Sequence, residues 1–265
     1  MPFRLWAGAA SETGEHRAVN QDAAFTASWG TAVADGVGGG PAGDLASATF
    51  IHRFAAGRLS PLDAEALAVS VRAANWDLRA HVERDPALHG MATTFTGLFL
   101  SDRASLLLAH TGDSRAYLLR GGVYAQQSRD DSYVQALVDR GLVAPEDAAT
   151  HPRRNIITAS LSGAERDAAT VAEYDLFDGD RWLLCSDGLS DYVPADDIEE
   201  LLRIPRSPSA AAADLVALAL EAGTRDNVTV VVCDVVPSDE VADDRERASF
   251  YGAAATRFNE ELESA

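Results

Sequence analysis

Apolar residues in this chain gather in short runs that are bounded by Gly, Asp, Asn and Ser. Runs of this kind predict β-strands, and the joints of two or three residues between several of them predict antiparallel meanders. The expected strands are Phe3–Ala10, Ala23–Ala27, Ala32–Ala34, Thr93–Leu100, Ala104–His110, Ser114–Leu119, Val123–Gln126, Thr170–Phe177, Arg181–Cys185 and Val228–Val236.

A second pattern, with apolar residues three and four positions apart, predicts helices between these strands. In the segment Pro61–Val82, Leu67, Val71 and Leu78 form one apolar stripe. Ser60 suits the N-cap of this helix, and the proline that follows suits its first position. Further helices are expected at Gly43–Gly57, Asp130–Arg140, Ala144–Ala149, Asp196–Leu202 and Ala210–Ala222.

The 265 residues fit one large domain or two small ones, and 47% hydrophobic residues suffice for a sizeable core. The composition changes after Pro237, because residues 238–265 hold eight acidic residues against three arginines. We therefore expect a folded body, residues 1–237, and an acidic C-terminal tail, residues 238–265. Apolar residues recur every four positions in this tail, which leaves open a helix docked on the body or a solvated segment. They are Phe250, Ala254, Phe258 and Leu262.

The formal net charge is −19. This charge argues against nucleic acid as a partner, since a phosphate backbone requires a cationic surface. The chain has no lysine, which excludes the phosphate-binding lysines of P-loop and kinase motifs and also Schiff-base chemistry. A phosphate group would have to be bound by arginine, by metal ions or by backbone N–H groups.

Cys185 and Cys233 lie within apolar runs, so we expect buried free thiols rather than a disulfide. No apolar run approaches the roughly 20 residues of a transmembrane helix. The N-terminal residues lack the apolar core of a secretory signal. These features predict a cytoplasmic protein without a membrane segment, and we expect a monomer.

Aspartates stand at the ends of several expected strands. Asp35 follows an apolar run and precedes Gly36, and the glycines at 38–40 leave backbone carbonyls exposed there. The strand-end aspartates are Asp22, Asp35, Asp113, Asp187 and Asp226. Asp-Gly is also a common turn signal, so each of them alone is equally consistent with a solvated turn.

If these strand ends converge, the carboxylates repel one another and require a counter-charge. Divalent cations supply it, and a ligand set of oxygen atoms without His or Cys indicates Mg²⁺, Mn²⁺ or Ca²⁺ rather than Zn²⁺. Two such ions about 3.5–4 Å apart activate a bridging water as a nucleophile. Convergence itself does not follow from the spacing of the residues.

Six motifs carry a resemblance to a known family. In order and spacing they resemble the metal-dependent Ser/Thr protein phosphatases (type 2C, or PPM) of bacterial type, over about Phe3 to Val236. The motifs are RAVNQDA, VADGVGGG, GMATTFTGLFL, HTGDSRAYLL, CSDGLSDYV and RDNVTVVV. The resemblance implies an α+β fold with a central β-sandwich of two antiparallel sheets flanked by helices on both sides (α-β-β-α). The metal ions would lie at one edge of the sandwich.

The resemblance also implies a ligand set for two core ions, Mn²⁺ or Mg²⁺. Asp35 would bridge the two ions, and Gly36 would give its carbonyl to one of them. Asp187 and Asp226 would hold the other ion. Asp22 would act through a metal-bound water.

Further implied roles concern a third ion and the substrate. Asp113, Asp187 and Asp191 would form the third-ion site of many family members. Arg17 would bind the phosphate. The arginines of the HPRRN segment, residues 151–155, suit substrate contacts and a structural role equally well.

Three residues depart from the family pattern. Val37 stands where many members have a histidine assigned as general acid and where bacterial members usually have methionine, so solvent or a metal-bound water would protonate the leaving group. Gln21 replaces a glutamate and leaves Asp22 in place. Asp131 replaces a histidine before the expected helix at 130–140.

The implied activity is hydrolysis of phosphoserine and phosphothreonine in proteins that a Ser/Thr kinase has phosphorylated, by attack of a metal-bridging hydroxide. One alternative is a regulatory or binding module that kept the fold and lost turnover. Another is a phosphatase dedicated to one partner, such as an anti-anti-sigma factor. The complete set of aspartates favours the active enzyme over the regulatory module.

Overall fold

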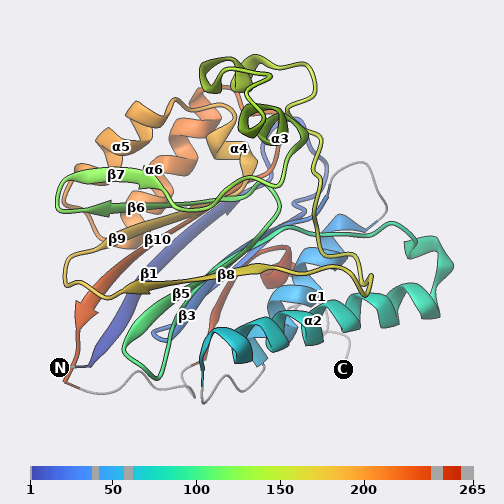
Figure 1. Cartoon of the computed structure of the whole chain (residues 1–265), viewed down its shortest axis with the longest axis horizontal. Helices are drawn as coiled ribbons and strands as arrows, with labels where there is room; N and C mark the ends of the chain where they lie inside the picture. The colour runs from blue at the N-terminus through green and yellow to red at the C-terminus, as the bar shows by residue number, and fades with distance from the viewer. Residues whose placement is uncertain (1, 38–41, 57–61, 240–246, 258–265) are drawn as a thin grey trace.

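Two antiparallel sheets face one another at the centre of the molecule (Figure 1). The computed structural model describes all residues except 1, 38–41, 57–61, 240–246 and 258–265. One sheet has the strand order β1-β10-β9-β6-β7, and the other has the order β11-β2-β3-β4-β5-β8. Neighbouring strands pair antiparallel in both sheets, as the short joints predicted.

The elements follow the expected order along the chain. The strands are β1 (Phe3–Glu12), β2 (Asp22–Thr26), β3 (Gly30–Asp35), β4 (Phe95–Leu100), β5 (Ser105–Thr111), β6 (Arg115–Arg120), β7 (Val123–Gln126), β8 (Thr170–Asp175), β9 (Arg181–Cys185), β10 (Val228–Pro237) and β11 (Ser249–Gly252). The helices are α1 (Gly43–Ala56), α2 (Ala64–Arg84), α3 (Tyr133–Asp139), α4 (Asp187–Ser190), α5 (Ala195–Arg203) and α6 (Pro208–Glu221), with 3₁₀ turns η1 (Pro86–Leu88) and η2 (Pro145–Thr150).

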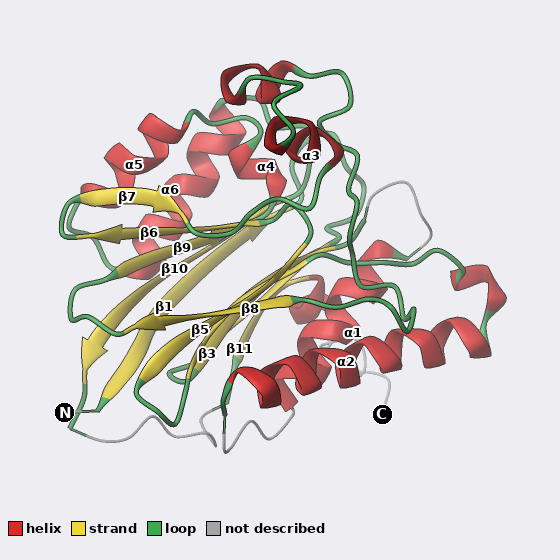
Figure 2. Ribbon diagram, in the orientation of Figure 1, coloured by secondary structure: helices red, strands yellow, loops and turns green. Residues whose placement is uncertain are grey.

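Helices cover the outer face of each sheet (Figure 2). α1 and α2 pack on the six-stranded sheet, and α6 packs on β1 and β10 of the five-stranded sheet. Each sheet has an apolar cluster beneath its helices, and the inner faces of the two sheets enclose a third. This inner cluster includes Leu98, Trp182 and Val231, all fully buried. Apolar residues on both faces of the strands therefore produce four layers, and the predicted α-β-β-α architecture is confirmed.

Two helices begin later than the sequence predicted. α2 begins at Ala64, where Asp63 is the N-cap and accepts a hydrogen bond from the backbone of Ala66; the predicted cap at Ser60 lies outside the described residues. α3 begins at Tyr133 with Ser132 as its N-cap. The two aspartates before that serine do not join the helix, because their side chains bind residues at the start of β6 and in the turn before it.

The segment after Pro237 contributes to the body of the protein. β11 extends the six-stranded sheet by pairing with β2, and residues 253–257 are helical. Ala254 is fully buried, and Arg257 Nε donates to Asp44 on α1 at 3.1 Å. Of the four apolar residues that suggested a helix, Phe250 lies in the strand β11 and Ala254 lies in a helical turn. Phe258 and Leu262 lie outside the described residues. The division at residue 237 stays a prediction.

Cys185 and Cys233 are buried free thiols, as predicted. Burial raises the pKa of Cys185 to about 12, so its reactive thiolate form is scarce at neutral pH. In the described part of the chain, no helix combines the length and the apolar character that a membrane span requires.

We predict that Phe95→Ala lowers the free energy of unfolding by about 3–5 kcal/mol, the usual cost of removing a buried phenylalanine. Phe95 is fully buried, with ring centroids 4.9 Å from Phe50 and 5.0 Å from Phe54. Urea denaturation measures the change. Val123→Ala is the control, because Val123 is 68% exposed and its truncation should cost less than about 0.5 kcal/mol. Equal losses would contradict the assignment of the core.

Candidate metal centre

The strand-end aspartates meet at one edge of the sandwich. Asp22 begins β2 and Asp35 ends β3, and the two are direct cross-strand partners. Asp187 begins α4 directly after β9, and Asp226 lies two residues before β10, which pairs with β9. Asp113 lies in the turn between β5 and β6. Antiparallel pairing alternates strand directions, so starts and ends of different strands come together at this edge.

Close backbone contacts fix the end of β3. A Cβ atom on Gly36 would lie 2.3 Å from the carbonyl oxygen of Gly43 and 2.8 Å from that of Gln21. The Gly36 N–H donates to the Gln21 oxygen at 3.0 Å, and Ser47 Oγ donates to the same oxygen at 2.6 Å. Only glycine therefore allows β3, the loop before β2 and the start of α1 to meet at this point.

The carboxylates of the cluster interact strongly with one another. The pKa of Asp35 is raised well above its ordinary value, first by burial and then by neighbouring negative charges. Those charges belong to Asp22, Asp187, Asp113 and Asp226. The pKa of Asp187 is raised in the same way, first by burial and then by the other carboxylates. The structure thus brings the five strand-end aspartates into one electrostatic cluster. From the sequence alone, this convergence had to be assumed.

A closed ring of hydrogen bonds supports Asp22 between the two sheets. Ser186 Oγ donates to Asp22 Oδ2 at 2.7 Å and accepts from the backbone of Thr229 at 3.0 Å. Thr229 Oγ1 lies 2.7 Å from Ser11 Oγ, which accepts from Asn20 Nδ2 at 2.9 Å. Asn20 Oδ1 in turn accepts from the Asp22 N–H at 3.1 Å. Burial raises the pKa of Asp22 to about 6, although the bond from Ser186 acts in the opposite direction.

Two carboxylate oxygens of the cluster suit a cation. Asp22 Oδ1 and Asp187 Oδ1 are buried and have no hydrogen-bond partner, and such buried acceptors require an explanation. As they are placed, however, no three or more His, Cys, Asp or Glu side chains among the described residues stand close enough together to hold an ion by themselves. Mn²⁺ and Mg²⁺ fit this open arrangement, because hard cations take oxygen ligands and Mg²⁺ keeps several waters.

Arg17 lies against the same cluster. Its Nη2 atom is 2.6 Å from Asp226 Oδ2, and its Nε atom donates to the Arg225 carbonyl at 3.4 Å. Asp226 Oδ1 accepts from the N–H of Asn227 at 2.8 Å. A carboxylate offers about four lone-pair sites, so Asp226 can hold Arg17 and still face a cation.

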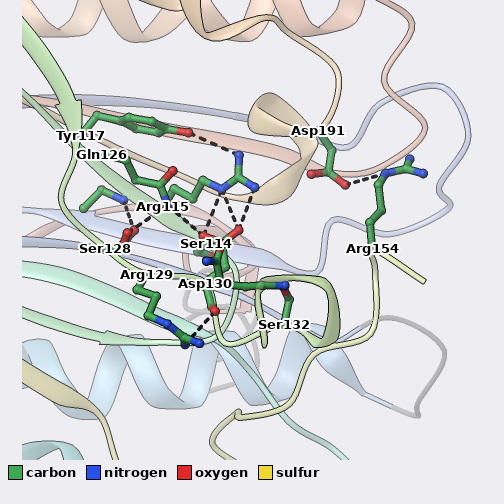
Figure 3. A network of polar contacts seen from close by, with 12 residues as sticks. Ser114, Arg115, Tyr117, Gln126, Ser128, Arg129, Asp130, Ser132, Arg154 and Asp191 are labelled. Atoms are coloured by element: carbon green, nitrogen blue, oxygen red, sulfur yellow. Dashed lines mark hydrogen bonds and ion pairs between the residues drawn. The ribbon is translucent and has the colours of Figure 1, made fainter. Parts of the chain in front are cut away.

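Asp113 and Asp191 form a second part of the cluster, toward α3. Burial and the charges of Asp130 and Asp191 raise the pKa of Asp113 to about 7. Asp191 Oδ2 lies 3.3 Å from Nε of Arg154, which comes from the HPRRN segment (Figure 3). That segment therefore reaches the metal cluster, and Arg154 supplies positive charge beside the carboxylates predicted for a third ion.

Asp130 and Asp131, which precede α3, bind residues on either side of Asp113. Arg115 binds Asp130 through Nε and Nη2, at 2.9 and 2.7 Å from Oδ2 (Figure 3). Asp131 Oδ2 accepts from the N–H of Gly112 at 3.1 Å, which shows what this departure from the family pattern does. His110 is a buried core histidine whose Nε2 donates to the Arg129 carbonyl at 3.0 Å.

Sequence reasoning missed the residues that hold the aspartates in place. Ser186 supports Asp22, and Asn227 contacts the loop before β2. Both are adjacent in sequence to predicted ligands, and this adjacency was the one available signal. Their partners lie more than 150 residues away along the chain, so only the fold identifies them.

A β-sandwich with an acidic cluster and an arginine at one edge defines a protein suited to bind divalent cations together with an anionic substrate. No protein-family model matches the chain. The chain is 44% identical over 240 residues to the serine/threonine protein phosphatase PstP of Mycobacterium tuberculosis (strain H37Rv), which covers 87% of this chain and 45% of PstP. The chain thus spans just under half the length of that relative.

Two further comparisons cover more than four fifths of the relative's own length. The serine/threonine phosphatase Stp of Listeria monocytogenes (strain EGD-e) is 32% identical over 209 residues, covering 76% of this chain and 82% of Stp. A crystal structure of the PstP catalytic domain in complex with two manganese ions is 41% identical, with a TM-score of 0.80, and covers 89% of this chain and 100% of that chain. The chain belongs to the PPM family of bacterial serine/threonine phosphatases.

We predict that the metal-free protein loses stability as pH rises from about 4 to about 7. Aspartates whose pKa is raised on folding, such as Asp22 (about 6) and Asp113 (about 7), bind more protons in the folded state than in the unfolded state across this range. The free energy of unfolding therefore falls with rising pH. Urea denaturation in EDTA measures this slope. With saturating Mn²⁺ the slope should be shallower or reversed, and identical slopes with and without Mn²⁺ would contradict the cluster.

Proposed function

We propose that this protein is a metal-dependent phosphatase that hydrolyses phosphoserine and phosphothreonine in proteins. The observation that carries the proposal is the convergence of five strand-end carboxylates with Arg17 at one edge of the sandwich. Membership of the PPM family supports the same reaction.

Within this proposal, the cluster holds two core ions. Asp35 would bridge them, Gly36 would contribute its carbonyl to one, and Asp187 and Asp226 would hold the other, with Asp22 acting through a water. The PstP catalytic domain has been solved with two manganese ions, which supports Mn²⁺, and Mg²⁺ fits the same oxygen ligands. When bound, such ions would neutralise the carboxylates, orient phosphate oxygens and supply an activated water as the nucleophile toward phosphorus.

The protein's own side chains orient the substrate and the ligands. Arg17 carries a fixed positive charge that binds phosphate oxygens, and its ion pair with Asp226 holds it beside the ions. Ser186 fixes the rotamer of Asp22 through its hydrogen bond. Val37 has no proton to donate, so the leaving serine or threonine would take its proton from solvent or from a metal-bound water.

The substrates we propose are phosphorylated proteins, the products of a Ser/Thr kinase, in the cytoplasm. The net charge of −19 would repel a phosphoprotein from the metal-free protein. Bound cations reverse the local field, so we expect substrate binding as well as turnover to depend on metal.

Asp35→Asn tests the reaction and its metal centre together. We predict that wild type releases phosphate from a phosphothreonine peptide with Mn²⁺ and not with EDTA. In the variant kcat/KM should fall by more than about 100-fold, the upper range for loss of even an outer-shell partner of a metal site. Asp178→Asn, an exposed turn residue, is the control. A folded, Mn²⁺-binding wild type without turnover on phosphothreonine or phosphoserine peptides would favour the regulatory module or the single-partner enzyme.

Asp113→Asn tests the third ion. We propose that Asp113, Asp187 and Asp191 hold it, and that the two core ions do not need Asp113. Calorimetric titration with Mn²⁺ should give three sites in wild type and two in Asp113→Asn, with the affinity of the tightest site unchanged within about threefold, or about 0.65 kcal/mol. Loss of all binding in this variant, or an unchanged stoichiometry, would contradict the assignment.

A further inference from the structure

Asn227 connects one strand end of the cluster to a loop that is distant in sequence. Its side chain is 2% exposed and makes three hydrogen bonds. Nδ2 donates to the carbonyls of Thr13 at 2.8 Å and Val19 at 3.1 Å, and Oδ1 accepts from the N–H of Gln21 at 2.8 Å. Both donors and the acceptor of the amide are therefore used within residues 13–21.

The loop that Asn227 holds carries Arg17 and leads directly into Asp22. The same loop touches the backbone next to Asn227, because a Cβ on Gly14 would lie 2.7 Å from the Asp226 carbonyl oxygen. Gly14 has φ +75°, a conformation that favours glycine. Arg17 adds its ion pair with Asp226. The loop thus contacts Asp226 and Asn227 at several points along its length.

The main chain of Asn227 also contacts the turn that carries Asp187. A Cβ on Gly188 would lie 1.9 Å from the Asn227 carbonyl oxygen. The helix α4 therefore approaches Asn227 as closely as a glycine allows. Asn227 lies between the Arg17–Asp22 loop on one side and Asp187 on the other, and it is the immediate neighbour of Asp226.

We infer that Asn227 is a positioning residue that sets the distance between the Arg17–Asp22 loop and the carboxylates of Asp187 and Asp226. Its amide is occupied by the loop, so we assign it no direct contact with the phosphate or the ions. By holding the loop it fixes Arg17 for phosphate binding and Asp22 for cation binding, so both affinities depend on one amide. The inference rests on the proposed function, and its metal-binding part can be measured without substrate.

Asn227→Asp and Asn227→Ala test the inference. The aspartate keeps an acceptor for Gln21 but loses both donors and places a carboxylate oxygen against a backbone carbonyl. Mn²⁺ affinity, measured by calorimetry, should fall about 10-fold or more, as for outer-shell partners of other metal sites. At saturating Mn²⁺, KM for p-nitrophenyl phosphate should rise about tenfold while kcat changes less than about threefold.

Asn75 provides a matched control. It is 5% exposed, donates through Nδ2 to the Ala164 carbonyl at 2.9 Å and accepts through Oδ1 from the Gly163 N–H at 2.8 Å. Asn75→Asp and Asn75→Ala should lower the melting temperature as the Asn227 variants do, without changing Mn²⁺ affinity or KM. If the Asn227 variants lose stability but keep wild-type Mn²⁺ affinity and KM, the residue is structural and the inference is overturned.

A second pair of variants covers the case in which the Asn227 variants do not fold. Gly14→Ala pushes the same loop away from Asp226, whereas Gly179→Ala introduces a side chain at a similar φ, +84°, with no atom within 4 Å. Only Gly14→Ala should weaken Mn²⁺ binding and raise KM. Equal behaviour of the two variants would overturn the inference. A wild type that binds Mn²⁺ without phosphatase activity would instead overturn the proposed function.

Discussion

Mutual repulsion among buried carboxylates is the constraint on which the site of this protein depends. Asp35 and Asp187 have raised pKa values because burial and neighbouring aspartates both disfavour their charged forms. The fold has to hold these groups together against that repulsion, since a flexible chain would let them separate. Divalent cations would reverse the sign of the interaction, so the arrangement that costs stability without metal would favour binding of the ions that we propose.

Two features of the fold oppose the repulsion. The first is backbone contact that leaves no room for a side chain, as at Gly36 against Gly43 and at Gly188 against Asn227. The second is a hydrogen-bonded ring that joins both sheets through Ser186 and ends on Asp22. Apart from Asp22 itself, neither feature includes a side chain that we propose as a metal ligand. Both restrict how far the strand ends can move, which is the requirement for a preorganised site.

Local signals predicted the antiparallel strands and most of the helices, whereas the four-layer architecture was implied by the resemblance to the phosphatase family. Alternating apolar runs with short joints predict antiparallel strands, and Asp-Gly pairs mark strand ends. Convergence of Asp22, Asp113 and Asp226 could not be derived in the same way, because it depends on pairings between distant segments. The predicted starts of α2 and α3 were each wrong by three residues, since Asp63 is the N-cap of α2 and Asp130 binds Arg115 instead of entering α3. The C-terminal strand was also missed, because an edge strand such as β11 has one partner and a short apolar pattern.

Arginine performs two tasks in this lysine-free acidic chain. Arg17 and Arg154 each bind a carboxylate of the cluster, Asp226 and Asp191 respectively, and so reduce its net negative charge. A guanidinium offers five N–H donors in a planar fork, so one carboxylate does not exhaust it. Donors that remain can bind phosphate oxygens while the ion pair persists. Because Asp226 holds Arg17 and can also face a cation, the proposed cation and phosphate sites would be coupled through one carboxylate, and Asn227, which donates its backbone N–H to that carboxylate, would help to position it.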